Sequence, residues 1–578
     1  MIASNLQSSL NLSADPCEDF YEYSCGGWIR NHTIPPDMPG LSQFDVTRKT
    51  VKDNLRGKRE TGLRVLKDLV NDWPMINNNQ EIPNFLWWKE VARLNKGHGF
   101  SFILDNYVGL DDKNTSIYSI YVDAPSLGVG RTQLVKPDDQ NNKRILEAYK
   151  VLIEESAQLL DGGAGKLSAN IKADIQHVVD FESDLAKIMA EPSARRINKI
   201  DLQTFVNTYN IPLLDIERQV FANYATIDGN TGLIVYDRDY FRQLADLLNR
   251  THAKDVKIIQ NYLKWRTVRS LGTHTSKAFR DIRFAFNRVL IGVEEPPALW
   301  EVCVNLVNDR LPFAVGRVYV DKHFPEEAKR DMDVLIDALN KAFTELLDEN
   351  EWMEKETKDK AKEKLVLKDN SFLATITTND LWATKKKLTK LNKSNKDRST
   401  HDWNRGPATV NAFFNPKLNR IRAHYDKFGN LYNWRDGVTQ QRFNERIKCF
   451  INQYNGYNDS NAGMNINGKT TVGENIADNG GLRQAFRALE NYSFRKQSLP
   501  GSMKSFTSEQ LFFLSFANVW CSNIRDKALK RWIETDPHIP DKYRVWGTVS
   551  NSESFAKAFN CKPKTNMNPE PKDKCILW

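Results

Sequence analysis

The sequence predicts a mainly α-helical fold with small β elements. Two long stretches, Asp174–Met189 and 329–365, carry apolar side chains three and four positions apart, which is the period of an amphipathic helix. Residues 117–122 (IYSIYV) instead have the β-branched and aromatic composition of a strand. The glycine-rich run Gly162–Ser168 lacks the spacing of a phosphate-binding loop, so we predict a turn between two helices there.

Composition places the chain among ordinary globular proteins. Its 578 residues are enough for more than one core, and 27% charged with 40% apolar residues fits neither a disordered nor a membrane-embedded chain. The net charge of +9 is modest for this length. Much of it comes from a lysine-rich run, 385–396, without interleaved aromatic residues, which predicts a solvated linker and no nucleic-acid binding.

Cysteines and glycosylation motifs indicate the secretory pathway. The seven cysteines form no C-x-x-C pair; two stand near the start and four in the last third, which suits disulfides between the two ends in an oxidising compartment. The N-x-S/T motifs begin at Asn11, Asn31, Asn114, Asn249, Asn392, Asn458 and Asn491. No signal-peptide or membrane-span pattern is present. We therefore expect an extracellular or cell-surface ectodomain whose native N-terminus lies beyond this sequence.

The most specific stretch is 473–481, with the sequence GENIADNGG. Its two acids, Glu474 and Asp478, stand four positions apart, so on a helix they share one face. Carboxylates in this arrangement suit a zinc site, where one binds the metal and the other orients a second ligand. An acid pair at this spacing is more often a solvated helix face. The flanking Gly473 and the following Asn-Gly-Gly make this pair more specific than a generic one.

Other stretches have equally specific patterns. They are DPCEDFYEYSCGGW (15–28), CVNLVNDRLPFAVGRVYV (303–320), VNAFFNP (410–416), QLFF (510–513), VWC (519–521) and the run from TDPH to YR (535–544). With GENIADNGG, they resemble the neprilysin family of zinc endopeptidases over nearly the whole chain. The resemblance implies a two-lobed, neprilysin/thermolysin-like metallopeptidase ectodomain whose chamber admits short peptides. It also implies a secreted or type II membrane protein, held at a membrane only through an N-terminal anchor absent from this chain.

The family's main zinc motif is missing. In H-E-x-x-H, two imidazoles one helical turn apart bind zinc and the glutamate acts as general base. None of the nine histidines here is followed by glutamate, and no two stand four positions apart. The family pattern runs as far as Ile421 and resumes at Arg422, without the apolar stretch and the H-E-x-x-H helix between them. We therefore expect the large lobe to be incomplete.

Four residues match family positions with chemical roles. By resemblance, Glu474 is the third zinc ligand, and the sole one that survives, while Asp478 orients a ligating histidine. His538 matches the imidazole that stabilises the tetrahedral oxyanion, a contribution on the order of 3 kcal/mol. Arg544 matches the guanidinium that holds a substrate carbonyl or carboxylate through its planar fork. His538 alone would fit an ordinary surface histidine equally well, and its TDPH…YRVWG context favours the family role.

The resemblance also assigns peptide binding and domains. Asn411 and Ala412 match the Asn-Ala pair that binds a peptide backbone like an added strand. Residues 15–370 correspond to the N-terminal region, which comprises the mostly helical lobe and the first part of the large lobe. Residues 371–408 are a polar linker, and 409–578 correspond to the C-terminal peptidase domain without its zinc-binding helix.

The resemblance implies a definite disulfide pattern. The expected pairs are Cys17–Cys561, Cys25–Cys521 and Cys449–Cys575. Cys303 is expected to be unpaired, because the family's segment that carries its partner is shortened here between Arg56 and Gly62.

Three hypotheses about function follow. In the first, the chain cannot assemble the zinc site, does not bind zinc stably and does not hydrolyse peptides, but still binds short peptides as a decoy or scaffold. In the second, it is an active zinc endopeptidase with replacement ligands, of which His424 is the nearest candidate. In the third, it is a non-functional splice or gene-model product of an active peptidase locus.

Overall fold

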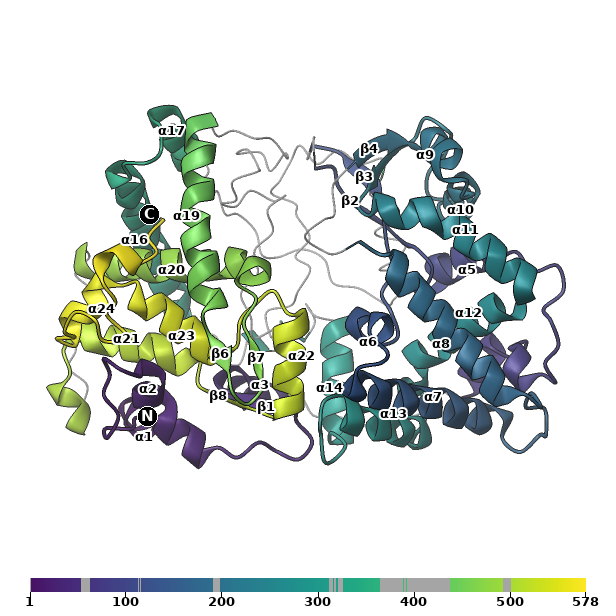
Figure 1. Ribbon diagram of the computed structural model, residues 1–578, viewed down its shortest axis with the longest axis horizontal. Coiled ribbons are helices and arrows are strands. Elements are labelled where there is room, and N and C mark those ends of the chain that lie inside the picture. Colours follow the sequence, from purple (N-terminus) through teal and green to yellow (C-terminus); the bar gives the residue numbers. More distant parts are fainter. Residues whose placement is uncertain are drawn as a thin grey trace.

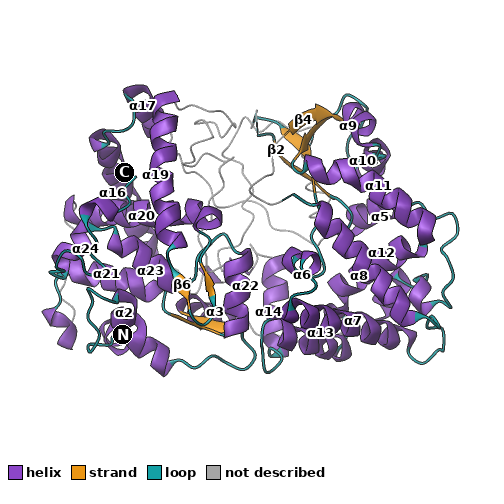
Figure 2. Ribbon diagram, in the orientation of Figure 1, coloured by secondary structure: helices purple, strands orange, loops and turns teal. Residues whose placement is uncertain are grey.

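The computed structural model describes residues 2–53, 63–112, 114, 116–190, 198–310, 315–316, 319–320, 326–363, 388, 391, 437–491 and 501–577. Figure 1 shows these residues in two bodies side by side. Of the described residues, we call those within 63–310 the N-terminal lobe and those within 2–53, 326–363, 437–491 and 501–577 the C-terminal lobe. Helices dominate both lobes and strands are few (Figure 2). The predicted mainly α, two-lobed fold is therefore confirmed.

The N-terminal lobe packs helices around one small sheet. Its helices and 3-10 turns are α4 (Leu63–Leu69), η1 (Pro74–Ile76), α5 (Trp87–His98), α6 (Arg131–Val135), α7 (Gln140–Asp161), α8 (Ile171–Ile188), α9 (Leu202–Tyr209), α10 (Leu213–Val220), α11 (Arg238–Asp255), α12 (Lys257–Leu271), η3 (Gly272–His274), α13 (Lys277–Leu290) and α14 (Leu299–Arg310). The strands are β2 (Asp105–Leu110), β3 (Tyr118–Asp123), β4 (Asn198–Asp201) and β5 (Gly232–Val235), in the order β2-β3-β5-β4. Only β3 and β5 run parallel.

The local predictions for this lobe are close to the structure. The helix predicted over Asp174–Met189 is α8, which begins three residues earlier, and the predicted strand at 117–122 is β3, shifted by one residue. The glycine-rich run does connect two helices. Gly162 ends α7 in the left-handed conformation, with φ of 61°, which glycine adopts without steric cost.

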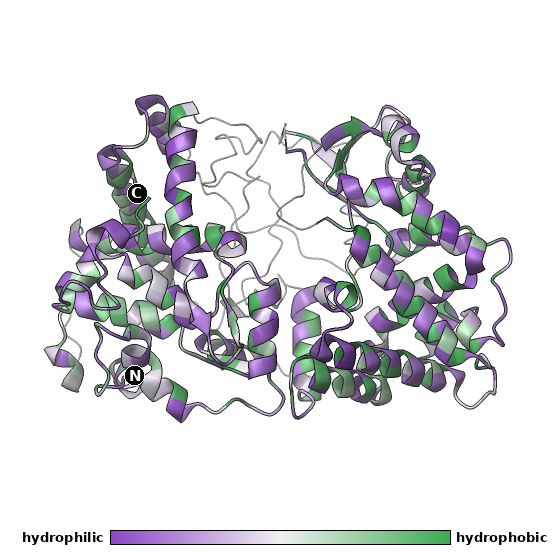
Figure 3. Ribbon diagram, viewed as in Figure 1, coloured by the Kyte–Doolittle hydropathy of each residue, from purple (hydrophilic) through white to green (hydrophobic). Residues whose placement is uncertain are grey.

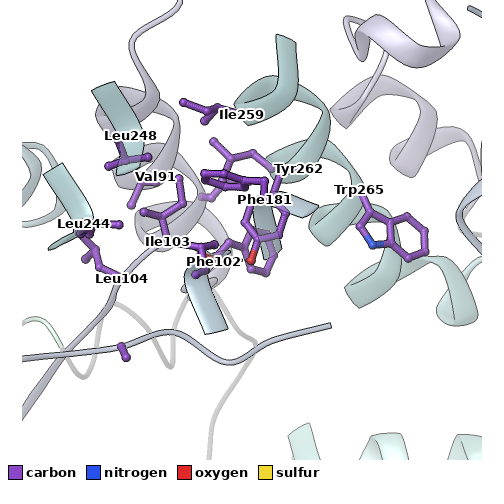
Figure 4. Close-up of a cluster of buried hydrophobic side chains, with 14 of the residues drawn as sticks. Val91, Phe102, Ile103, Leu104, Phe181, Leu244, Leu248, Ile259, Tyr262 and Trp265 are labelled. Carbon is purple, nitrogen blue, oxygen red and sulfur yellow. Dashed lines mark hydrogen bonds between the residues drawn. The ribbon is translucent and has the colours of Figure 1, made fainter. Parts of the chain in front are cut away.

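A single large hydrophobic core holds the N-terminal lobe together. Figure 4 shows part of it, where the ring of Phe181 from α8 packs edge-on against Tyr262 of α12, with the ring centroids 5.1 Å apart. Every residue of α12 from Ile258 to Val268 is buried, so even its charged side chains need internal partners. Arg266 has one in Glu182, whose Oε1 lies 3.1 Å from the Arg266 Nη1.

A buried acid in this lobe gives a testable pH dependence. Glu217 on α10 is fully buried, and its Oε1 accepts a hydrogen bond of 3.0 Å from the Asn106 amide. Burial raises the pKa of Glu217 from its ordinary 4.5 to about 8, although the bond from Asn106 opposes the rise. Between these two values the folded protein holds a proton that the unfolded chain has lost, so the free energy of unfolding falls as the pH rises.

We therefore expect Glu217→Gln to remove this fall in the free energy of unfolding between pH 5 and pH 8.5. At pH 8.5 the variant should be more stable than the parent by on the order of 2 kcal/mol, and near pH 5 the two should be similar. Urea unfolding at both pH values measures the difference. Glu147→Gln, at a carboxylate on the surface of α7, is the matched control. An unchanged slope in Glu217→Gln would contradict the assignment.

The C-terminal lobe is built from both ends of the chain. Its elements are α1 (Ile2–Ser9), α2 (Phe20–Asn31), β1 (Gly40–Ser42), α3 (Gln43–Asp53), α16 (Glu326–Glu349), α17 (Lys355–Glu363), α19 (Gly437–Asn455), β6 (Asn458–Asp459), β7 (Met464–Asn465), α20 (Gly468–Asn491), η6 (Gly501–Ser505), α21 (Ser508–Val519), β8 (Ser522–Ile524), α22 (Asp526–Thr535), α23 (Asp541–Ser550), α24 (Glu553–Ala558) and η7 (Pro571–Asp573). In both lobes the helices carry hydrophilic and hydrophobic faces (Figure 3). No helix that the structure describes is long and apolar enough for a membrane span.

The helical pattern at 329–365 corresponds to two helices. Between α16 and α17, the Asn350 side chain accepts hydrogen bonds from the backbone amides of Trp352 and Met353, at 3.2 and 3.1 Å, and so replaces helical bonds with a turn. The end of α16 is buried, with Phe343 and Leu347 in a core.

Three disulfides tie the N-terminal segment and α19 to the C-terminal end. They are Cys17–Cys561, Cys25–Cys521 and Cys449–Cys575, which are the pairs that the resemblance implies. Cys303 on α14 is a free cysteine, also as implied. The same connection continues in an antiparallel ladder, where Gly40 of β1 pairs with Ile524 of β8. The N-terminal segment is therefore an integral part of the C-terminal lobe.

Candidate functional site

The GENIADNGG stretch lies within α20. The helix starts after Asn467, whose side chain accepts hydrogen bonds from the amides of Lys469 and Thr470, each at 3.1 Å. Glu474 and Asp478 follow one turn apart, so both carboxylates lie on the same face of α20.

The asparagines of the same stretch hold α20 in place. Asn479 donates to the hydroxyl of Tyr454 on α19, at 3.1 Å, and accepts from Asn551 after α23, at 2.9 Å. Asn475 is fully buried and donates to Thr471 one turn earlier, at 2.9 Å. The two bonds of Asn479 fix the helix against its neighbours and so fix the direction in which its two acids point. This role of the asparagines was not predicted from the sequence.

Asp478 forms a paired hydrogen bond with Arg544 of α23. The Nε and Nη2 of Arg544 donate to the two carboxylate oxygens at 2.7 and 2.6 Å, and the two side chains are only 12% and 11% exposed. Burial raises the pKa of Asp478 above its ordinary value, and the hydrogen bonds from Arg544 offset part of the rise. The guanidinium also lies 3.8 Å from the ring centroid of Trp520.

His538 lies in the turn between α22 and α23. Its Nδ1 and its backbone N–H both contact Asp536 Oδ1, each at 2.8 Å, while Trp532 of α22 donates from its indole nitrogen to the His538 carbonyl at 2.9 Å. Its Nε2 lies 3.5 Å from an oxygen of Glu474. The hydrogen bond to Asp536 raises the pKa of His538 above its ordinary value, with a further contribution from Glu474, against the effect of partial burial.

The structure thus brings the pair Glu474 and Asp478 together with the pair His538 and Arg544, which lies much later in the sequence. It adds three residues that sequence reasoning missed: Asp536, Trp520 and Trp532. The spacing of Asp536 and His538 is a signal that could have been used, since an aspartate often accepts from the amide two residues later. The two tryptophans gave no such signal, because their role depends on tertiary packing.

A cavity of about 430 Å³ opens beside these residues. From the C-terminal side it is lined by Trp520, Trp532, Asp536, His538, Asp541 and Arg544. From the N-terminal segment it is lined by β1 and the first turns of α3. His538 and Arg544 therefore share a hollow with room for part of a small ligand.

Several predicted features lie outside the described residues. These are the peptide-binding pair Asn411 and Ala412, the joint between Ile421 and Arg422, His424, and nearly all of the polar linker and of the lysine-rich run.

The described residues alone do not fit a zinc ion. A zinc site of this class takes three protein ligands. Glu474 has one imidazole within 3.5 Å, and both oxygens of Asp478 are engaged by Arg544. In the part of the chain that the structure describes, no three His, Cys, Asp or Glu side chains gather in a way that could hold a metal.

The two-lobed helical fold and the GENIAD stretch on α20 are the features expected of the metallopeptidase class that the sequence resembles. Comparison with known proteins then shows the family: models of peptidase family M13 match residues 16–61, 58–367 and 417–575. The chain belongs to peptidase family M13. Neprilysin-1 of Trittame loki is 31% identical over 690 positions, covering all of this chain and 94% of the relative. Human neprilysin is 27% identical over an alignment that covers all of this chain and 91% of human neprilysin.

Solved structures show the same fold. The zinc metalloprotease Zmp1 of Mycobacterium tuberculosis, in complex with an inhibitor, superimposes with a TM-score of 0.82 at 22% identity and covers 99% of both chains. PepO of Lactobacillus rhamnosis gives 0.78 at 20% identity, over 98% of this chain and 100% of PepO. The superposition on the open state of Zmp1 has a TM-score of only 0.61. The lobes of this chain are therefore arranged more like those of the inhibitor complex than those of the open state.

Proposed function

We propose that this chain is a pseudopeptidase of the neprilysin family, an extracellular ectodomain that binds short peptides without hydrolysing them. The observation that carries the proposal is the absence of H-E-x-x-H from these 578 residues. Without it, two of the three zinc ligands and the general base are missing, so no zinc-activated water can form. The three disulfides and the N-x-S/T motifs support an oxidising, extracellular location and a glycosylated chain.

The contacts of the four family residues agree with this proposal. Glu474 lies beside His538, and Asp478 is engaged by Arg544, so charges that would otherwise surround a metal compensate one another. The alignment with the relative from Trittame loki extends over 690 positions although this chain has 578 residues, so some positions have no residue here. That difference supports the loss of whole segments.

Peptide binding requires only the residues that contact a ligand. The cavity beside His538 and Arg544 offers an imidazole and a guanidinium that can donate to peptide carbonyls. The paired hydrogen bond to Asp478 uses Nε and Nη2 of Arg544, so Nη1 takes no part in that pair. In this proposal, Asn411 and Ala412 add backbone hydrogen bonds to an extended peptide.

A binding and cleavage assay tests the proposal. The purified chain is titrated with fluorescent short peptides, and mass spectrometry then determines whether the peptides remain intact. We expect saturable binding that a chelator does not alter, with every peptide recovered whole. His538→Ala should weaken binding about ten-fold, whereas His252→Ala on α11 should not. Cleavage that a chelator abolishes would contradict the proposal and favour replacement zinc ligands.

One observation favours a different account, a non-functional product of an active peptidase locus. Three apolar residues on one side of α16, Met332, Leu335 and Ile336, are 47%, 38% and 40% exposed. An uncovered apolar helix face is expected where a packing partner has been lost. Genomic sequence between the codons of Ile421 and Arg422 separates the two accounts, because an intact exon encoding H-E-x-x-H would favour this second one.

A further inference from the structure

A cavity of about 230 Å³ lies where the two lobes meet. The N-terminal lobe lines it with residues of α6, α7 and α13, and the C-terminal lobe lines it with α22 and the turn between β6 and β7. Figure 1 shows α22 at the edge of the C-terminal lobe that faces α6. Lys527 and Arg531 of α22 line this cavity, whereas Ala528 and Trp532 line the one beside His538. The helix α22 therefore contributes one face to each cavity.

Two residues that line the cavity between the lobes, one from each lobe, carry a buried atom without a hydrogen-bond partner. Gln133 of α6 is only 2% exposed. Within the part of the chain that the structure describes, its Oε1 and the Nη1 of Arg531 both lack a partner. The Nε2 of Gln133 donates to Asn142 Oδ1 at 3.4 Å, and this bond assigns the orientation of the amide, with Oε1 as the unpartnered atom.

These two atoms are close and chemically complementary. A side-chain carbon at Gly130, the residue before α6, would lie 2.2 Å from Gln133 Oε1 and 3.8 Å from Arg531 Nη1. Both atoms therefore lie beside the same point. One is an acceptor and the other a donor. Because a buried polar atom without a partner destabilises the fold, a hydrogen bond between them would remove both costs at once.

The charge of Arg531 also favours an acceptor from the N-terminal lobe. Burial lowers the pKa of Arg531, and the carboxylate of Glu534, one turn later on α22, opposes the shift. Arg269 of α12 adds a like charge within electrostatic range. The other charged residues that line the cavity are Asp526, Lys527 and Lys530. Positive charges thus outnumber negative ones around Arg531, so a further oxygen beside its guanidinium is stabilising.

The position of α22 bears on the site beside His538. The helix is anchored at its start by Arg525, which pairs with Glu294 of the N-terminal lobe and donates to two backbone carbonyls of the N-terminal segment, at 2.9 and 3.2 Å. Further along, the indole of Trp532 donates to the His538 carbonyl at 2.9 Å. A bond at Arg531 would therefore fix the part of α22 that holds the His538 turn.

We propose that Gln133 and Arg531 form a hydrogen bond across the lobes, and that this bond positions α22 for peptide binding. Arg531 is then a positioning residue, which acts on the peptide through Trp532 and His538 without touching it. A small rotation of the guanidinium, or of one lobe against the other, completes the bond, and polar interfaces between domains permit such motion. This inference rests on the proposed peptide-binding function and adds a control of that function by the N-terminal lobe.

A double-mutant cycle on the full chain tests the inference. Gln133→Glu keeps the size of the side chain and places a carboxylate opposite Arg531, so we expect about five-fold tighter binding of a fluorescent hexapeptide. Arg531→Met keeps the methylene stem and removes the donor, and should weaken binding about five-fold. In the Arg531→Met background, Gln133→Glu should bring no gain. The lost bond to Asn142 is common to both backgrounds and cancels in the cycle.

Hydrogen exchange of the α22 amides, measured without peptide, follows the bond itself. Gln133→Glu should slow this exchange about three-fold, and only where Arg531 is present. Lys527→Met removes a positive charge from an exposed residue of the same cavity, so it is the matched control and should change neither measurement.

The two measurements separate the possible failures. Equal effects of Gln133→Glu with and without Arg531 on peptide binding overturn the inference and leave the proposed function standing, whether or not the exchange rates are coupled. No binding of any peptide overturns the proposed function and with it the positioning role, while the exchange cycle still shows whether the bond forms.

Discussion

Removal of the disulfide between Cys25 and Cys521, by Cys25→Ser with Cys521→Ser, should lower the free energy of unfolding by about 4–5 kcal/mol. The bond joins residues 496 positions apart. Because Cys17–Cys561 already links the same two segments, the loop that the bond closes in the unfolded chain runs through that disulfide, and its closure still restricts the unfolded chain. Both sulfurs are fully buried in the core that α2 forms with α21 and α23, so the serine hydroxyls would also be poorly solvated. Urea unfolding and the yield of secreted protein measure the loss.

Cys303→Ser is the matched control, because that cysteine has no disulfide. It should unfold at the same urea concentration as the parent. A double serine variant at Cys25 and Cys521 within about 1 kcal/mol of the parent would mean that the N-terminal segment contributes little to the C-terminal lobe.

Breaking the pair between Asp478 and Arg544 should have the next largest effect. The Arg544 side chain is only 12% exposed, and Asp478→Ala removes the carboxylate that pairs with its guanidinium. We therefore expect a loss of about 3 kcal/mol in the free energy of unfolding. Arg544→Ala should cost a similar amount, since it leaves a carboxylate buried. The double variant should cost much less than the sum of the two single ones.

A double-mutant cycle from urea unfolding measures this coupling, which we expect to be about 2–3 kcal/mol. The surface pair Asp239 and Arg242, more than half exposed at both side chains, serves as the reference and should couple by under about 1 kcal/mol. Additive losses at Asp478 and Arg544 would show that the two residues do not act as a unit. Their fork would then not fix the position of Arg544 beside the cavity.

The fold could be anticipated from the sequence where a local pattern determines structure. The helical period located α8, and the glycines located the turn after α7. The helical pattern did not show the break between α16 and α17, because that break depends on hydrogen bonds from Asn350. No local pattern assigned residues 2–53 to the C-terminal lobe, and only the family resemblance, chiefly through the disulfides that it implied, linked them to the C-terminal end.

The site could be anticipated residue by residue, but its contacts could not. Motifs identified Glu474, Asp478, His538 and Arg544, and the structure places them together. The sequence contains no sign that Arg544 would engage both oxygens of Asp478, since this depends on how α23 packs against α20.

Zinc content tests the central claim most directly. Elemental analysis of the purified, monodisperse chain, after equilibration with zinc and removal of the excess, measures the metal bound per chain. A variant that carries an inserted H-E-x-x-H helix between Ile421 and Arg422, called the chimera, is the positive control. We expect the chimera to hold about one zinc per chain and the natural chain to hold almost none. About one zinc per natural chain, together with chelator-sensitive cleavage of peptides, would contradict the account.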